Sequence, residues 1–241
     1  YPITSTVSVD QAAGFSIVKY TGNGYSTATI GHGLGAKPNW VILKPLSYSG
    51  AWWIIHKDLG TNKVLEFTTS AQADISSFGG GGLKYSTFTN AVIGGGDGSS
   101  NSDLWNKSGD NYIAYCFAEK EGYSKFGIYT GNGDSFGPFV YTGFKPTWFL
   151  VKSLDATQNW QLWDSKRNSS TPVPEIGNPR VRTLSPSVAN SETGDYEVDF
   201  CSTGVKIRNN DTAWNGDGNN YIYMCFAECP LVAGGVVSTG G

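Results

Sequence analysis

The stretch that decides the fold is Tyr-Thr-Gly-Asn-Gly at residues 20–24, because the same five residues return at 129–133, 109 residues later. Further blocks return in the same order and at nearly the same offset. They are Lys37–Lys44 with Lys145–Lys152, Trp52 with Trp160, Trp105-Asn106 with Trp214-Asn215, and Cys116–Glu119 with Cys225–Glu228. Ordered blocks at a constant offset exclude coincidence. The chain is therefore a duplication of one module.

The length of the repeat indicates what kind of module was duplicated. Solenoid units run to about 20–50 residues, whereas a complete small β-sandwich has about 100. We expect the two copies to span about 12–121 and 122–230. This predicts a first domain at 1–121, with a short N-terminal arm, and a second domain at 122–241, with a Gly-rich C-terminal tail. The linker at Glu121-Gly122 is very short.

The composition favours short strands. Gly occurs 32 times in 241 residues, aromatics make up 14%, and charged residues only 15%, against about 25% in an average soluble protein. These values exclude a helical bundle. Asn-Gly is also a strong hairpin signal. We predict strands at Phe15–Tyr20, Trp40–Lys44, Trp52–His56, Val64–Phe67, near Phe88 and at Tyr112–Glu119, then Trp148–Lys152, Asn159–Trp163, Val181–Leu184, Tyr196–Cys201, Val205–Arg208 and Tyr221–Ala227. The fold class is all-β, as two tandem antiparallel β-sandwich modules of jelly-roll type.

Charge and hydropathy exclude two classes of partner. The net charge is −3 and Lys and Arg form no basic tract, so nothing favours binding to nucleic acid. No apolar run approaches the roughly 20 residues that cross a bilayer, so we expect no membrane insertion.

Strand alternation assigns side chains to faces. Trp52 and Trp160 recur between the copies, so we place them in the core; Trp53, Ile55 and Trp163 are then predicted to face outward. Two interpretations of this second apolar face stay open. Either loops or the sister module cover it, or it contacts another subunit or a ligand.

The candidate catalytic residues do not recur. His32 aligns with Tyr141, and His56 with Asp164, so neither position keeps its chemistry. The repeated acid Glu119/Glu228 indicates a solvated strand end or an ion pair with a nearby Lys, rather than the acid pair of a glycosidase. We therefore predict no catalytic residue.

The cysteines and aspartates do not form a recognisable metal site. Cys116, Cys201, Cys225 and Cys229 lack zinc-ligand spacing, so we interpret them as reduced thiols and predict no metal site. Calcium is a weak alternative, since it binds oxygen ligands but the acids match no defined calcium loop. These acids are Asp97, Asp103, Asp110, Asp211 and Asp217.

The repeated pairs Trp105-Asn106 and Trp214-Asn215 lie in amide-rich loops. Aromatic rings stack on sugar faces and amides bond sugar hydroxyls in both directions. The same pairs also fit a structural tryptophan beside a turn-forming Asn. Both interpretations stay open. The candidate ligand- or partner-binding residues are Trp53, Ile55, Trp163, Trp105, Asn106, Trp214 and Asn215.

The motifs at Gly14–Gly24, Gly31–Pro38 and Tyr112–Glu119 resemble a module of tailed-phage structural proteins, especially those of marine phages and cyanophages. In the second copy, Tyr141–Phe144 replaces the His-Gly-Leu-Gly loop. The resemblance implies a virion component with laminin-G-like or concanavalin-like sandwiches on fibres, spikes or capsid surfaces. It implies no catalytic residues.

These observations predict a non-enzymatic virion protein on the particle exterior, as a capsid decoration or a tail-fibre or spike domain, assembled in the host cytoplasm. Its expected partners are other virion proteins, sister subunits in an arrangement such as a trimer, and host surface glycans. The alternative is a carbohydrate-binding module of a larger secreted or cell-surface protein. A glycan-cleaving enzyme is a third hypothesis.

Overall fold

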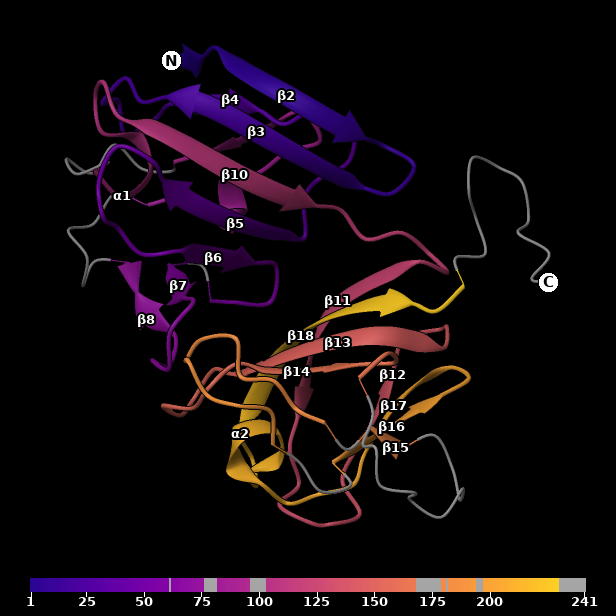
Figure 1. Ribbon diagram of the computed structural model, residues 1–241. Helices are drawn as coiled ribbons and strands as arrows, with labels where there is room; N and C mark the ends of the chain where they lie inside the picture. The colour runs from indigo at the N-terminus through magenta and orange to yellow at the C-terminus, as the bar shows by residue number, and fades with distance from the viewer. Residues whose placement is uncertain are drawn as a thin grey trace. The chain divides into compact units, whose positions relative to one another are not determined.

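The computed structural model describes residues 1–60, 62–75, 82–95, 103–167, 179–180, 182–193 and 197–229 (Figure 1). The fold is all-β, and the described strands form several sheets that are antiparallel except for one strand pair. The chain divides into two compact units, Tyr1–Phe67 with Gln72–Glu119, and Thr68–Ala71 with Lys120–Gly241. The main division falls after Glu119, two residues before the predicted end of the first domain.

The first unit contains two sheets. The larger has the order β2 (Ser5–Asp10), β3 (Phe15–Thr21), β10 (Asn111–Phe117), β5 (Trp40–Pro45), β6 (Trp53–His56), β7 (Lys63–Glu66), β8 (Ala73–Asp74). The smaller has the order β1 (Pro2–Ile3), β4 (Thr29–Gly31), β9 (Val92–Gly94), with β1 parallel to β4. A short helix, α1 (Asp103–Asn106), precedes β10.

The second unit repeats this plan. One sheet has the order β11 (Ser124–Thr130), β18 (Asn220–Ala227), β13 (Pro146–Ser153), β14 (Gln161–Asp164); the other has β12 (Phe139–Tyr141), β17 (Gly204–Ile207), β16 (Val198–Cys201), β15 (Pro179–Arg180). The helix α2 (Thr212–Asn215) precedes β18, as α1 precedes β10. The duplication read from the sequence is thus present in the strand pairing.

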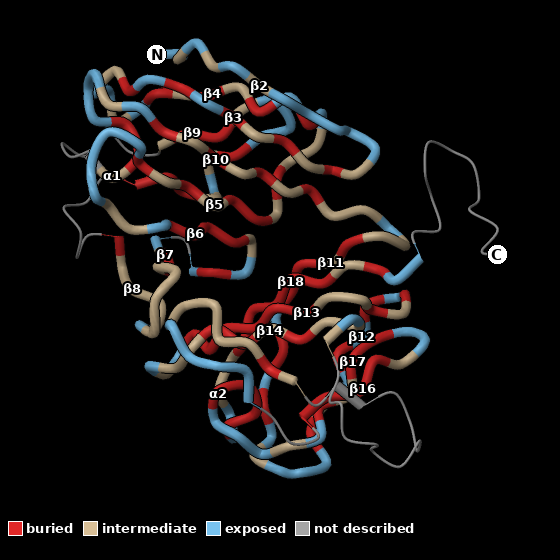
Figure 2. Tube along the Cα trace, in the orientation of Figure 1, coloured by how far each residue is buried: buried red, intermediate tan, exposed pale blue. Residues whose placement is uncertain are grey.

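Each unit has its own apolar core, to which both of its sheets contribute (Figure 2). In the first unit, Val18 and Ala114 of the larger sheet join Ile30 and Ile93 of the smaller one. In the second unit, Phe149 and Cys225 join Val140 and Phe200 in the same way. Burying such side chains contributes roughly 1.5–3 kcal/mol each.

The repeated Tyr-Thr-Gly-Asn-Gly stretch is held against the short helix. Gly22 runs so close to it that an added Cβ would lie 2.2 Å from the Lys107 carbonyl oxygen, and Gly24 has a positive φ of 80°. The backbone N–H of Asn23 donates to Asn106 Oδ1 at 2.8 Å, and the Tyr20 hydroxyl donates to the Trp105 carbonyl at 2.5 Å.

The second unit reproduces these contacts one by one. The Asn132 N–H donates to Asn215 Oδ1 at 3.0 Å, and the Tyr129 hydroxyl donates to the Trp214 carbonyl at 2.7 Å. A Cβ on Gly131 would lie 2.4 Å from the Gly216 carbonyl oxygen. The residues that recur at this turn are therefore those that fix the strand to the helix.

The predicted assignment of faces at β6 and β14 is wrong. Trp53, Ile55 and Trp163 are buried in the two cores, whereas Trp52, predicted to be buried, is 41% exposed. Trp160 is buried as predicted. Alternation failed because all four residues of β6 are buried, so apolar side chains lie on both faces and do not reveal which one meets the opposite sheet.

The strand predicted near Phe88 also differs from the structure. The segment before Phe88 is a 3₁₀ turn, η2 (Tyr85–Thr87), and the strand lies further on, at β9. Val181 and Tyr196, the first residues of two predicted strands, lie outside the described residues.

The N-terminal arm makes the two units unequal. In the first unit, β1 pairs with β4 and β2 pairs with β3, so the arm covers one edge of each sheet. In the second unit, β11 and β12 are edge strands within the part of the chain that the structure describes. Their outward side chains Ile128, Phe139 and Tyr141 are exposed.

Candidate functional site

The second unit contains a cavity of about 490 Å³, and the lining residues that the structure describes all belong to this unit. Its wall combines the start of β14, the segment 183–193, the residue before β16, and α2 with the segment that leads into it. The lining residues are Gln158, Asn159, Gln161, Thr183, Ser185, Asn190, Ser191, Thr193, Glu197, Asn209, Asp211, Ala213 and Trp214.

The lining is rich in groups that both donate and accept hydrogen bonds. Its polar side chains are mostly amides and hydroxyls, with the carboxylates of Glu197 and Asp211 as the charged groups. No Lys, Arg or His belongs to this lining as far as the structure describes it. Amides and hydroxyls bond in both directions, so this wall suits an uncharged ligand with many hydroxyls.

Hydrogen bonds within the protein fix several of these side chains. Trp163 Nε1 donates to Glu197 Oε2 at 2.6 Å, which orients the carboxylate beside β16. Ser185 Oγ donates to Gln161 Oε1 at 3.2 Å. Asp211 caps α2 by accepting the Ala213 N–H at 2.8 Å. These side chains are therefore held in place by the protein itself.

Two buried polar atoms in this wall have no hydrogen-bond partner among the described residues. They are the Thr183 hydroxyl and the Trp214 indole N–H, whose residues are 2% and 5% exposed. Each unpaired buried group costs about 1–3 kcal/mol. Each of the two atoms has less than 1 Å² of accessible surface, so a ligand hydroxyl would satisfy them only where the wall shifts to admit it. The N–H of Trp105, the equivalent of Trp214, is also unpaired, so the Thr183 hydroxyl is the feature peculiar to the second unit.

The first unit has a much smaller cavity at the equivalent place. It measures only about 10 Å³ and its wall is apolar, including Trp53, Val64, Leu104 and Trp105. The strand pairing sets the correspondence, because Ile54 pairs with Leu65 as Leu162 pairs with Leu184. Gln161 thus stands where the first unit has Trp53, Thr183 where it has Val64, and Ala213 where it has Leu104.

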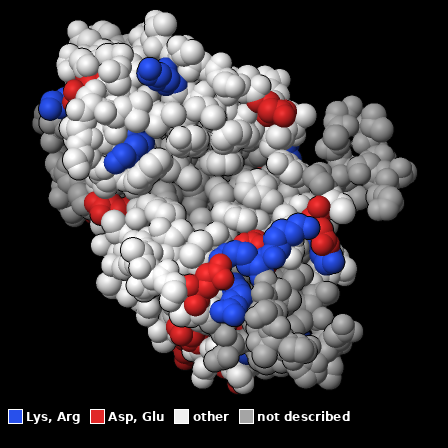
Figure 3. Space-filling view, in the orientation of Figure 1, with Lys and Arg blue, Asp and Glu red and all other residues white. Residues whose placement is uncertain are grey.

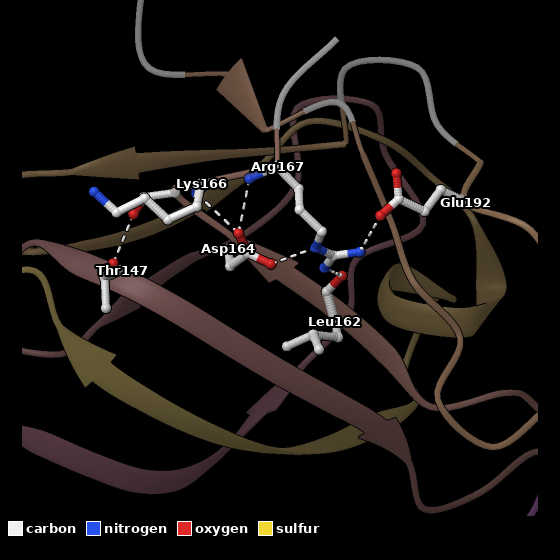
Figure 4. A network of polar contacts seen from close by, with 7 residues as sticks. Thr147, Leu162, Asp164, Lys166, Arg167 and Glu192 are labelled. Carbon is white, nitrogen blue, oxygen red and sulfur yellow. Dashed lines mark hydrogen bonds and ion pairs between the residues drawn. The ribbon is translucent and has the colours of Figure 1, made fainter.

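Charged side chains around the cavity are paired with one another. Arg167 bonds Asp164 and Glu192, and it also donates to the Leu162 carbonyl (Figure 4). Burial opposes the charge on Asp164, but the hydrogen bonds from Arg167 outweigh it and hold the pKa of this carboxyl below its usual value. On the face seen in Figure 3, blue and red side chains of the second unit lie next to each other.

Of the predicted binding residues, only Trp214 lines the cavity. Trp53, Ile55 and Trp163 are core residues, and Asn106 and Asn215 are fully buried braces of the repeated turn. Asn106 Nδ2 donates to the Tyr25 carbonyl and Asn215 Nδ2 to the Asp134 carbonyl, each at 2.8 Å. The prediction missed Gln161, Thr183 and Glu197. Comparing the copies at the repeat offset aligns Gln161 with Trp53, whereas Thr183 lies outside that offset and is aligned with Val64 only by the strand pairing.

Both histidines act as acceptors in turns. The Leu34 N–H donates to His32 Nδ1, and the Asp58 N–H to His56 Nδ1. Burial lowers the pKa of His32, and it lowers the pKa of His56 to about 3. The residue equivalent to His32 is Thr142 rather than Tyr141, since Ile30 and Val140 are the matching buried residues of β4 and β12.

The repeated acids form ion pairs at strand ends. Glu119 lies 3.2 Å from Lys57, and Glu228 lies 2.7 Å from Lys145. This confirms one of the two interpretations drawn from the sequence.

The cysteines are free, and burial raises the pKa of Cys116 to about 12. No group of three or more His, Cys, Asp or Glu residues suited to a metal occurs in the described ranges. Asp97 lies outside them.

Comparison with known proteins gives a family but no activity. A family model described as a domain of unknown function, DUF7483, matches residues 2–230, and so spans both repeats. No curated protein and no solved structure matches the chain. Within the described residues, no helix has the length and apolar character that crossing a membrane requires.

Proposed function

The chain belongs to the DUF7483 family, whose description names no activity, and from its geometry we propose that it is a glycan-binding protein that catalyses no reaction. The observation that carries this proposal is the cavity of about 490 Å³ in the second unit. Its amide and hydroxyl lining offers paired donors and acceptors, and Trp214, a core residue, forms part of the wall.

We further propose that each unit is a β-sandwich. Two observations support this finer description: each unit has two sheets, and each core draws residues from both of them. The jelly-roll type of connection and the likeness to laminin-G or concanavalin modules are part of the same proposal.

For the biological setting, we propose the exterior of a tailed-phage virion, as a capsid decoration or a tail-fibre or spike domain. The motifs at Gly14–Gly24 and Tyr112–Glu119 support this. Exposed aromatic side chains in the second unit, Phe136 and Tyr141, offer surface for sister subunits or other virion proteins. The alternative is a carbohydrate-binding module of a secreted or cell-surface protein, and antibody labelling of intact particles distinguishes the two.

The test of glycan binding is an array of bacterial surface oligosaccharides probed with the full chain. Ala213→Leu restores the larger residue of the first unit and fills part of the cavity, so bound signal should fall at least about tenfold. Ser202→Leu, which adds similar bulk at an exposed turn outside the cavity, should leave the signal unchanged. An array without a binding oligosaccharide, or equal signal from both variants and the unmodified chain, would overturn the proposal.

The absence of catalysis has its own test, because Glu197 and Asp211 place two carboxylates in one cavity. Incubation of bound oligosaccharides with the chain should release no reducing ends. Release that disappears in Glu197→Gln would replace this proposal with a glycosidase.

A further inference from the structure

We infer that the cavity of the second unit takes a neutral sugar ring, read by the Thr183 hydroxyl and the Trp214 indole N–H, and that it excludes acidic sugars. This inference rests on the proposed function and names its ligand class. Four observations carry it: the size of the cavity, its unpaired polar atoms, its charge, and its difference from the first unit.

The size suits a small polyhydroxylated ligand. A volume of about 490 Å³ falls within the roughly 300–1,000 Å³ of typical small-molecule sites. The equivalent cavity of the first unit, about 10 Å³, admits none. Binding therefore belongs to one unit of the duplicated chain.

The unpaired atoms call for a partner with hydroxyls. The indole N–H of Trp214 only donates, whereas the Thr183 hydroxyl donates and accepts. A sugar hydroxyl also does both, so it satisfies either atom. Since Val64 occupies the equivalent position in the first unit and lines its cavity, the Thr183 side chain points into the same region and adds a hydroxyl there.

The charge of the lining argues against acidic sugars. Its charged residues are two acids, Glu197 and Asp211. Arg167 pairs with Asp164 and Glu192, and Arg208 pairs with Asp199 at 2.5 Å. A carboxylated or phosphorylated ligand would place an anion beside the buried carboxylate of Glu197 and the exposed carboxylate of Asp211, with these arginines already engaged, so like-charge repulsion disfavours it.

The difference between the units supplies the matched variants. Thr183→Val restores the residue of the first unit at nearly constant volume and removes only the hydroxyl. Trp214→Phe removes the indole N–H, and Trp105→Phe makes the same change at the equivalent position of the first unit. A role in ligand binding predicts loss of affinity from the first two variants but none from the third.

The experiment is calorimetric titration of the full chain with neutral disaccharides (lactose, maltose, diacetylchitobiose) and acidic ones (sialyllactose, digalacturonate). At least one neutral probe should bind, and no acidic one. Thr183→Val should weaken binding about three- to tenfold, the effect of one hydrogen bond, without lowering the melting temperature, because it removes an unpaired buried hydroxyl. Trp214→Phe should weaken binding similarly, and Trp105→Phe should not change it.

Each contrary result has a distinct meaning. Binding of acidic probes alone, or of no neutral probe, overturns this inference while the glycan array still decides the proposed function. Unchanged affinity in both Thr183→Val and Trp214→Phe overturns the assigned contacts. A lower melting temperature with unchanged affinity in Thr183→Val shows a purely structural residue, which also overturns the inference.

Discussion

Individual residues of the two copies keep a backbone role even where their chemistry differs. His56 accepts the N–H of Asp58, and its equivalent, Asp164, accepts the N–H of Lys166. His32 accepts from Leu34 as Thr142 accepts from Phe144. At each of these positions the side chain accepts the backbone N–H of the residue two places further along the chain. An imidazole, a carboxylate and a hydroxyl can all do this, so exchanging one for another preserves the turn.

The buried His56 should make the first unit sensitive to mild acid. Its pKa is about 3 in the folded chain, against an ordinary 6.5, so below pH 6.5 the unfolded chain takes up a proton that the folded chain refuses. Stability is complete above that pH and falls as pH decreases toward 3, by up to about 1.4 kcal/mol per pH unit. Urea unfolding at pH 7 and pH 5 measures the loss.

The control for this prediction is His56→Asn, which keeps an acceptor for Asp58 but does not titrate. The loss of stability between pH 7 and pH 5 should shrink in this variant. His32, whose pKa burial also lowers, accounts for part of the remainder. An equal loss in the unmodified chain and in His56→Asn would show that this imidazole is not the group responsible.

At the scale of elements, the turn between β3 and β4 requires a residue without a Cβ at the position of Gly22. Gly22→Ala would drive a methyl group into the Lys107 carbonyl, 2.2 Å away, and should destabilise the first unit by about 3 kcal/mol or more. A Cβ on Gly109 would have no other atom within 4 Å, so Gly109→Ala should lower the free energy of unfolding only through the strain of its positive φ of 83°, by about 1–2 kcal/mol. Chemical denaturation of both variants checks the order, and equal losses would contradict it.

Most strands were predictable because their ends carry Gly, Pro and Asn and their interiors carry β-branched and aromatic residues. β3, β5, β10 and β18 fall within two residues of their predicted bounds. Faces were not predictable where a strand is buried on both sides, as β6 is. The short arm strands β1 and β2 were also missed, since β1 has only two residues and the alternation of Ser, Thr and Val in β2 differs little from that of a solvated segment.

At the scale of the whole molecule, ligand binding should stabilise one unit and not the other. Because the cavity belongs to the second unit, a bound sugar at 100 times its Kd adds about 2.7 kcal/mol to that unit alone. Hydrogen exchange should slow in β13 and β18 when the ligand is added, while β5 and β10 keep their rates. Equal protection of both units would contradict a single site.

The site was less predictable than the fold, because it is made by residues far apart in the sequence. Gln161, Thr183 and Ala213 carry no motif, and each by itself is an ordinary strand or loop residue. Their meaning appears only when the strand pairing aligns them with Trp53, Val64 and Leu104. The recurring Trp and Asn residues were predicted to bind a ligand or partner because they repeat, although most of them hold the turn that both copies share.

The N-terminal arm distinguishes the first copy of the module from the second. Residues 1–11 contact both sheets of the first unit, because β1 pairs with β4 and β2 pairs with β3. Ser5 also donates to the Gly31 carbonyl, and Gln11 donates to the Gly33 carbonyl. The residues at the corresponding place before the second unit form β10 of the first unit, so they cannot also pair with β11 and β12. A tandem fusion of the gene therefore gives an arm to the first copy alone. A third repeat fused to the C-terminus would again be preceded by the last strand of the repeat before it. Only the first repeat would therefore have arm strands on the edges of its two sheets.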